Sequence, residues 1–174
     1  MNTAYPTSPS KRCLIADDVR GSREALRCWL EECGFDCTLV DDGEQAWQAI
    51  QEDPPSLLIT DIEMPHCSGL ELLQRMRRDA SERVRTIPVL VITSLHDCKT
   101  LQTVRQLGGN GLLTKPLEKH STYSVILDLI AEEPQLDAFA MDWVNAEISK
   151  QGAISPTLRR LLEKVAANER DPGR

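Results

Sequence analysis

Residues 57–65 read LLITDIEMP, and the fold prediction starts from them. The run from Leu57 to Thr60 is short and mostly apolar, which is typical of a strand that is buried in a sheet. Asp61 follows at once. A carboxylate is costly to bury unless another group compensates its charge. An acid at the tip of an apolar strand therefore indicates either a helix cap or a functional position.

Four more short apolar runs occur along the chain, and segments with helical spacing separate them. The runs cover residues 13–16, 37–40, 88–93 and 111–114, and the helical segments cover residues 25–33, 46–50, 70–76, 101–107 and 125–130. Strands that alternate with helices predict a parallel sheet with helices on both faces. The predicted fold class is α/β, a doubly wound five-stranded parallel sheet.

The alternation ends near residue 131, which divides the chain into three parts. Residues 1–10 contain Pro, Ser and Thr and are expected to be a disordered lead-in. Residues 11–131 form the predicted α/β domain. Residues 132–174 are expected to be a helical extension with two apolar stripes, the first made of Leu136, Phe139, Ala140, Trp143, Val144 and Ile148 and the second of Leu158, Leu161, Leu162 and Val165.

The second helix of this extension has a clear predicted start, because Ser155 supplies an N-cap and Pro156 suits the first helical position. Both apolar stripes must be buried somewhere. They dock on the α/β domain, pair with another copy of the chain, or form a groove for a partner.

Composition limits the function classes. The chain has 174 residues and a net charge of −7, and its lack of a Lys/Arg block disfavours direct nucleic-acid binding. Its apolar runs are far shorter than the roughly 20 residues of a membrane helix, and residues 1–10 lack the apolar core of a secretory signal. We therefore expect a cytoplasmic protein. None of the six cysteines has CxxC spacing, so we interpret them as reduced thiols packed as small hydrophobic side chains.

A second strand also ends in acids, because Asp17 and Asp18 follow the run at residues 13–16. In a doubly wound sheet, ligands bind beyond the carboxyl ends of the strands, where the strand order reverses. If the first and third strands are neighbours, Asp17, Asp18 and Asp61 converge. Like charges raise one another's pKa values, and a hard divalent cation removes the conflict. Oxygen-only ligands favour Mg²⁺, and one carboxylate is a candidate nucleophile toward phosphorus.

Two further strand ends point into the same predicted crevice. Thr93 and Ser94 end the fourth strand and offer hydroxyl groups, whereas Lys115 follows the fifth strand and offers an ammonium group. Phosphoryl transfer depends mostly on positioning and on neutralisation of charge at the phosphoryl oxygens. A metal ion, a hydroxyl group and a lysine are sufficient for that chemistry.

Four motifs carry a resemblance to a known family. They are LIADD at residues 14–18, ITDIEMPHCSG at 59–69, VLVITS at 89–94 and LLTKP at 112–116. Through them, residues 11–131 resemble the receiver domain of response regulators in two-component signalling. The resemblance implies a flavodoxin-like sheet with strand order 2-1-3-4-5. It also implies a phosphoacceptor that is not an enzyme beyond its own phosphorylation and dephosphorylation.

The resemblance implies a role for each acidic position. Asp61 is then the phosphoacceptor, and its donor is a phosphohistidine on a sensor histidine kinase or phosphotransfer protein. Asp18 and Asp61 bind Mg²⁺ directly, Asp17 acts through a water molecule, and the backbone carbonyl of Glu63 completes the protein ligands. Phosphorylation then switches a surface that binds a downstream protein partner or mediates self-association through the C-terminal helices.

The remaining positions form the implied switch. Thr93, with Ser94 beside it, binds the phosphoryl group, Lys115 pairs with it, and Pro116 follows a cis peptide bond. The family often has an aromatic residue three positions before the lysine, but this sequence has Leu112. The usual aromatic readout of phosphorylation is therefore replaced by an aliphatic side chain.

Three alternatives stay open from the sequence. The chain is a receiver cut from a longer regulator with a DNA-binding or enzymatic output, or a Mg²⁺-dependent hydrolase that forms an aspartyl phosphate. Such hydrolases use Asp-x-Asp, whereas Glu63 stands at the second acidic position here. A nucleotide-binding Rossmann-like module is the third, but the glycine cluster at 108–111 precedes a strand and does not follow one.

Overall fold

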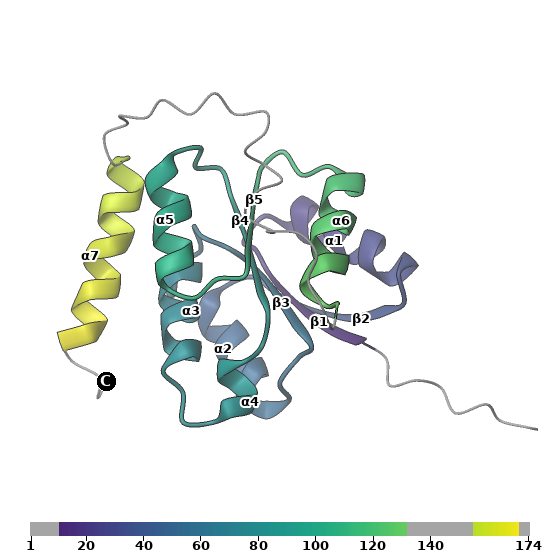
Figure 1. The fold of residues 1–174 in the computed structure, drawn as a ribbon, viewed down its shortest axis with the longest axis horizontal. Coiled ribbons are helices and arrows are strands. Elements are labelled where there is room, and N and C mark those ends of the chain that lie inside the picture. Colours follow the sequence, from purple (N-terminus) through teal and green to yellow (C-terminus); the bar gives the residue numbers. More distant parts are fainter. Residues whose placement is uncertain (1–10, 132–154, 171–174) are drawn as a thin grey trace, which may run out of the picture.

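A computed structural model describes residues 11–131 and 155–170, and it contains one five-stranded parallel sheet (Figure 1). The strands are β1 (Lys11–Ala16), β2 (Phe35–Val40), β3 (Leu57–Asp61), β4 (Val89–Thr93) and β5 (Gly111–Thr114). Their order is β2-β1-β3-β4-β5, and all neighbouring strands are parallel. The predicted fold class and strand order are confirmed.

Helices cover both faces of the sheet. They are α1 (Arg20–Glu32), α2 (Gly43–Glu52), α3 (Gly69–Arg77), α4 (Glu82–Arg85), α5 (Cys98–Gln106), α6 (Lys119–Leu129) and α7 (Pro156–Arg170). One apolar cluster joins the sheet to α2, α3 and α5, and a second joins it to α1 and α6. Strands β3 and β4 are buried along their whole length, as expected for inner strands covered on both faces.

Strand β2 begins at Phe35, two residues before the predicted start. Exposed Asp36 interrupts the apolar run there, so the sequence pattern did not reveal the first two residues of the strand. Exposed residues occur along β2 because it lies at the edge of the sheet. Phe35 itself is buried in the cluster with α1 and α6. Helix α4 was not predicted, because its four residues are too few to show a helical period.

Local signals place the loop that follows β3. Ser68 and Glu71 form a capping box at the start of α3, in which each side chain accepts a hydrogen bond from the backbone of the other residue. At Gly69, an added Cβ atom would lie 2.1 Å from the backbone oxygen of Asp61. Glycine is therefore required for the loop to pack against the end of β3.

Helix α7 docks within the chain. Ser155 Oγ accepts a hydrogen bond from the N–H of Leu158 at 3.1 Å, which confirms the predicted N-cap. Leu158, Leu161 and Val165 are buried in the same cluster as the apolar residues of α3, which α7 contacts. Three ways of burying this apolar stripe were considered. In the described structure it is buried by docking on the α/β domain of the same chain.

Two predicted segments lie outside the described residues. They are the lead-in at 1–10 and the first helix of the C-terminal extension, which falls within residues 132–154. Across residues 11–131 and 155–170, none of the helices has the length and apolar character needed to cross a membrane.

The six cysteines have no disulfide bond, but the prediction that they pack as hydrophobic side chains is only partly right. Cys13 and Cys67 are buried, and Cys37 and Cys98 are partly buried. Cys28 and Cys33 are exposed, because they lie on and just beyond the outer side of α1.

The docking of α7 is tested by Leu158→Ala. The substitution removes a fully buried side chain and leaves a cavity against α3, so we expect the free energy of unfolding to fall by about 2 to 5 kcal/mol. Urea denaturation followed by circular dichroism measures the change. Lys164→Ala, at an exposed position on the same helix, should have little effect. Equal effects of the two substitutions would contradict the docking.

Candidate functional site

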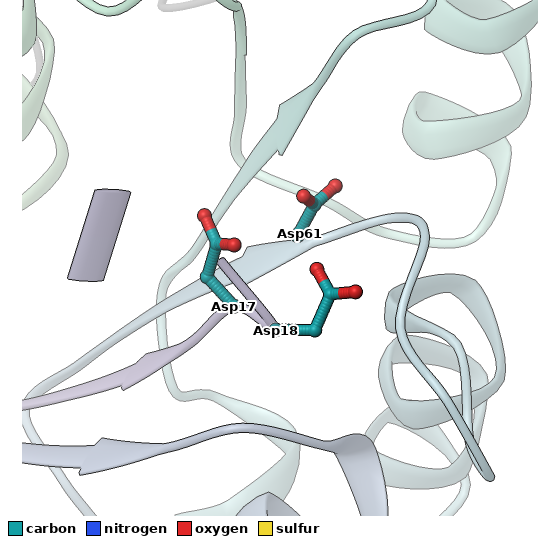
Figure 2. Close-up of side chains that lie close together, drawn as sticks. All are labelled: Asp17, Asp18 and Asp61. Atoms are coloured by element: carbon teal, nitrogen blue, oxygen red, sulfur yellow. The ribbon is translucent and has the colours of Figure 1, made fainter. Parts of the chain in front are cut away.

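Three carboxylates meet at the carboxyl edge of the sheet (Figure 2). Asp17 and Asp18 follow β1, and Asp61 is the last residue of β3. The strands are neighbours in register, with Ala16 paired to Thr60, so their ends deliver the three acids to one place. One carboxylate oxygen from each acid lies within 4.8 Å of the other two. The structure brings together the acids that the sequence analysis expected to converge.

The three acids differ in burial. Asp17 is fully buried, Asp61 is 5% exposed, and Asp18 is exposed. Asp17 Oδ1 accepts a hydrogen bond from the N–H of Val19 at 2.8 Å, and Asp61 Oδ1 accepts one from the N–H of Glu63 at 3.1 Å. These bonds fix one oxygen of each buried carboxylate and leave the other oxygen directed to other groups.

Lys115 supplies the positive charge for the buried pair. Its Nζ lies 2.9 Å from Asp17 Oδ2 and also contacts Asp61 Oδ2. The lysine is held at the end of β5, because its backbone N–H donates to the carbonyl oxygen of Thr93 at 2.7 Å. The Lys115–Pro116 peptide bond is cis. Residues far apart in the sequence thus form one ion cluster.

Burial and charge act in opposite directions on these groups. Burial raises the pKa of Asp61, although the hydrogen bond and charge of Lys115 partly offset this effect. Burial also acts to lower the pKa of Lys115, but its contacts with Asp61 and Asp17 outweigh burial and raise it. The lysine is therefore firmly charged, whereas the Asp61 carboxylate lacks full compensation.

The donor set suits a hard divalent cation. Asp17 Oδ2 is buried and receives no well-directed hydrogen bond, even though Lys115 is near. The three converging ligands are all carboxylate oxygens, and no thiol or imidazole joins them within the described residues. A small set of oxygen ligands that includes the exposed Asp18 suits Mg²⁺, because this ion keeps several water molecules when it binds to proteins.

The other predicted positions lie around this cluster in different environments. Thr93 is buried at the end of β4, and its Oγ1 accepts a hydrogen bond from the N–H of Leu95 at 3.0 Å. Ser94 and Glu63 are exposed. Leu112 is buried in the same apolar cluster as α3, α5 and α7, so its side chain lies within the core on that side of the sheet.

The sequence analysis missed two residues that shape the site. The guanidinium group of Arg23 donates a hydrogen bond to the backbone carbonyl of Asp17 and so ties α1 to the acidic turn. Gly69 lets the loop after β3 pack against Asp61. The signal for Arg23 was a basic residue six positions after Asp17, which is weak because exposed arginines are common on helices.

The fold and the site together define a class of protein: a doubly wound α/β domain with an acidic cluster and a lysine at its switch point. Residues 13–126 match the family model described as the response regulator receiver domain. This match covers more than half of the chain. The chain belongs to this family, and its receiver domain is that of a two-component response regulator.

Individual relatives agree with the family match. The chain is 29% identical over 153 residues to response regulator Rre1 of Synechocystis, covering 87% of this chain and 63% of that protein. It is 38% identical over 116 residues to the 3',5'-cyclic-nucleotide phosphodiesterase regA of Dictyostelium discoideum, covering 64% of this chain and 14% of that protein. The chain thus spans less than two thirds of the length of either relative.

A solved structure shares the fold. A putative response regulator from Chloroflexus aurantiacus superimposes with a TM-score of 0.65 at 28% identity. The alignment covers 69% of this chain and 97% of that one. Nearly all of that structure is therefore matched by part of this chain.

The ion cluster is tested by Lys115→Met in buffer without divalent cations. Without the lysine, the pKa of Asp61 rises further, so the folded variant holds this proton at pH values at which the unfolded chain has released it. We expect a stability loss of about 1 to 3 kcal/mol at pH 7. The loss should shrink as the pH falls toward about 4, the ordinary pKa of an aspartate.

Urea titrations at several pH values measure this effect. Lys119→Met is the matched control, because Lys119 pairs with Glu32 on the surface, away from the cluster. The control should show little change in stability at any pH. A pH-independent loss in Lys115→Met would show that the lysine acts by packing alone.

Proposed function

We propose that this protein accepts a phosphoryl group on Asp61 from a phosphohistidine of a sensor histidine kinase or phosphotransfer protein. The observation that carries the proposal is the position of Asp61, buried at the strand end between two other acids and Lys115. In the step, a carboxylate oxygen of Asp61 forms a bond to phosphorus while the P–N bond to the donor histidine breaks. The bonding electron pair stays on the imidazole nitrogen.

The acidic residues also serve to hold a cation. Asp18, Asp61 and the backbone carbonyl of Glu63 are the proposed direct ligands of Mg²⁺, and Asp17 acts through a water molecule. When bound, Mg²⁺ supplies positive charge that offsets the acids and the phosphoryl oxygens. The support for this assignment is the buried Asp17 oxygen without a directed hydrogen bond and the oxygen-only donor set.

Two residues are proposed to hold the phosphoryl group after transfer. Lys115 already contacts Asp61 and is proposed to pair with a phosphoryl oxygen. Thr93 gives up its bond with the Leu95 N–H and donates its hydroxyl to another phosphoryl oxygen, with Ser94 beside it. The chain is a phosphoacceptor under this proposal, and its own chemistry is limited to self-phosphorylation and self-dephosphorylation.

The acceptor assignment is tested by Asp61→Asn. The full chain is incubated with Mg²⁺ and a small phosphodonor such as acetyl phosphate, and phosphorylation is followed by intact-protein mass. We expect the wild type to gain one phosphoryl group and Asp61→Asn to gain none, because the amide is not a nucleophile. Glu63→Gln, an exposed acid two residues away, is the matched control and should still be phosphorylated.

Two further measurements sharpen this test. Asp18→Asn should retain phosphorylation only at a higher Mg²⁺ concentration, because it replaces a charged ligand with a neutral one. Chelation of Mg²⁺ should stop the wild-type reaction. Label on Asp61→Asn, or a reaction indifferent to chelation, would refute the corresponding assignment. Sustained turnover of a phosphate ester would instead support the hydrolase alternative.

The output of the switch is proposed to run through the cluster that contains α7. Movement of Thr93 toward a phosphoryl group pulls the loop between β4 and α5. Leu112 of β5 and Val104 of α5 share one apolar cluster with Leu158 and Leu161 of α7. A rearrangement of α5 therefore changes the surface on which α7 is docked, and a ligand shifts such an equilibrium by its differential affinity for the two states.

This coupling is reciprocal, which gives a second test. The described state has Thr93 bonded to the loop and Lys115 bonded to Asp61, so α7 docking favours the unphosphorylated state. Undocking α7 by Leu158→Ser with Leu161→Ser should then tighten the binding of beryllofluoride with Mg²⁺ by about fivefold or more. Lys164→Ser, at an exposed position of α7, is the control.

Hydrogen exchange of α7 and light scattering complete the experiment. We expect faster exchange in residues 156–167 when beryllofluoride binds, and no change in Asp61→Asn. A rise in mass to twice that of the chain would assign the output to self-association, and an unchanged mass would assign it to a different protein partner. Equal beryllofluoride affinity in docked and undocked variants would exclude α7 from the output.

A further inference from the structure

Two cysteines face each other across neighbouring strands, away from the acidic site. Cys13 of β1 and Cys37 of β2 are register partners in the parallel sheet. Partners in register direct their side chains to the same face, and both thiols lie at the apolar cluster with α1 and α6. Cys13 is 1% exposed, whereas Cys37 is partly exposed.

The backbone spacing matches that of a disulfide. Neighbouring strands lie about 4.7 to 4.9 Å apart, and the Cα atoms of a disulfide lie about 4.4 to 6.8 Å apart. The Cβ atoms must approach to about 3.8 Å, which requires a small shift of one strand. Strand β2 lies at the edge of the sheet, so it can shift without disturbing another strand.

The two thiols have different reactivity. The neighbouring Cys13 side chain lowers the pKa of Cys37. Burial raises the pKa of Cys13, and its contact with Cys37 raises it further. Cys37 thus has the more accessible and more easily ionised thiol. Cys13 is buried beside it in the core.

We propose that Cys13 and Cys37 form an oxidation site, at which a peroxide converts the register pair into an intramolecular disulfide. Among the residues described here, no other two cysteines are register partners. The edge strand becomes covalently fastened to β1 in the oxidised form. Because the bridge forms only after a shift of β2, it is reducible by an added thiol.

The step balances with hydrogen peroxide as the oxidant. The Cys37 thiolate attacks one peroxide oxygen, the O–O bond breaks, and hydroxide leaves, which gives a sulfenic acid on Cys37. The Cys13 sulfur then attacks the Cys37 sulfur, the S–O bond breaks, and water leaves with the proton of Cys13. Two thiols are oxidised and one peroxide is reduced to two water molecules.

The test uses the full chain carrying Cys28→Ser and Cys33→Ser, which removes the two exposed thiols. The protein is treated with hydrogen peroxide, denatured, and alkylated without a reductant. We expect the unalkylated protein to lose the mass of two hydrogen atoms and alkylation to fall by two sites. Digestion at arginine and at acidic residues should then yield a peptide containing Cys13 linked to a peptide containing Cys37, and a thiol reductant should separate them.

Two further variants in the same background decide the outcome. Cys37→Ser should keep all its remaining thiols, whereas Cys67→Ser, at a buried position outside the pair, should still form the bridge. Circular dichroism confirms that each variant is folded, and if Cys37→Ser is not, Cys37→Ala replaces it. A sulfinic or sulfonic acid on Cys37, a bridge to another cysteine, or an unchanged thiol count would each overturn the proposal.

Discussion

The charge balance between two buried carboxylates and one lysine is the constraint on which the site depends. Asp17 and Asp61 are buried at the ends of parallel strands, and burial raises the pKa of Asp61. Lys115 forms ion pairs with both carboxylates, because it follows β5 and its side chain extends across the end of the sheet. Lys115 supplies one positive charge for two buried carboxylates, and Asp18 lies close by. A divalent cation is suited to offset the remaining negative charge.

The geometry of this cluster follows from the sheet, and the sheet connects it to the rest of the molecule. Strand β4 delivers Thr93 to the site, and the loop after it leads to α5. Leu112 and Val104 lie in the cluster that also holds the buried leucines of α7. A closely packed core responds to a local shift by repacking, which is the physical basis for proposing α7 as part of the output.

The departures of this chain from its family lie where the output is proposed to be read. An aliphatic Leu112 stands at the position that is often aromatic, so no ring is present there to swing inward, and its side chain is buried in the cluster that contains α5. The exposed Glu63 adds negative charge beside Asp61 without entering the buried pair. The alignment with the solved relative covers 69% of this chain and 97% of the relative, so part of this chain lies outside the shared fold.

Local patterns in the sequence determined the alternating strands and helices, the capping residues Ser68 and Ser155, and the acids at the strand ends, because these depend on neighbouring residues. They missed the start of β2, where Asp36 faces solvent at a sheet edge, and the short α4. Only the tertiary structure decided which side chains meet: that Arg23 holds the turn at Asp17, that α7 packs on α3, and that Cys13 faces Cys37. Such contacts join residues distant along the chain, and strand order and register, which no local period encodes, bring them together.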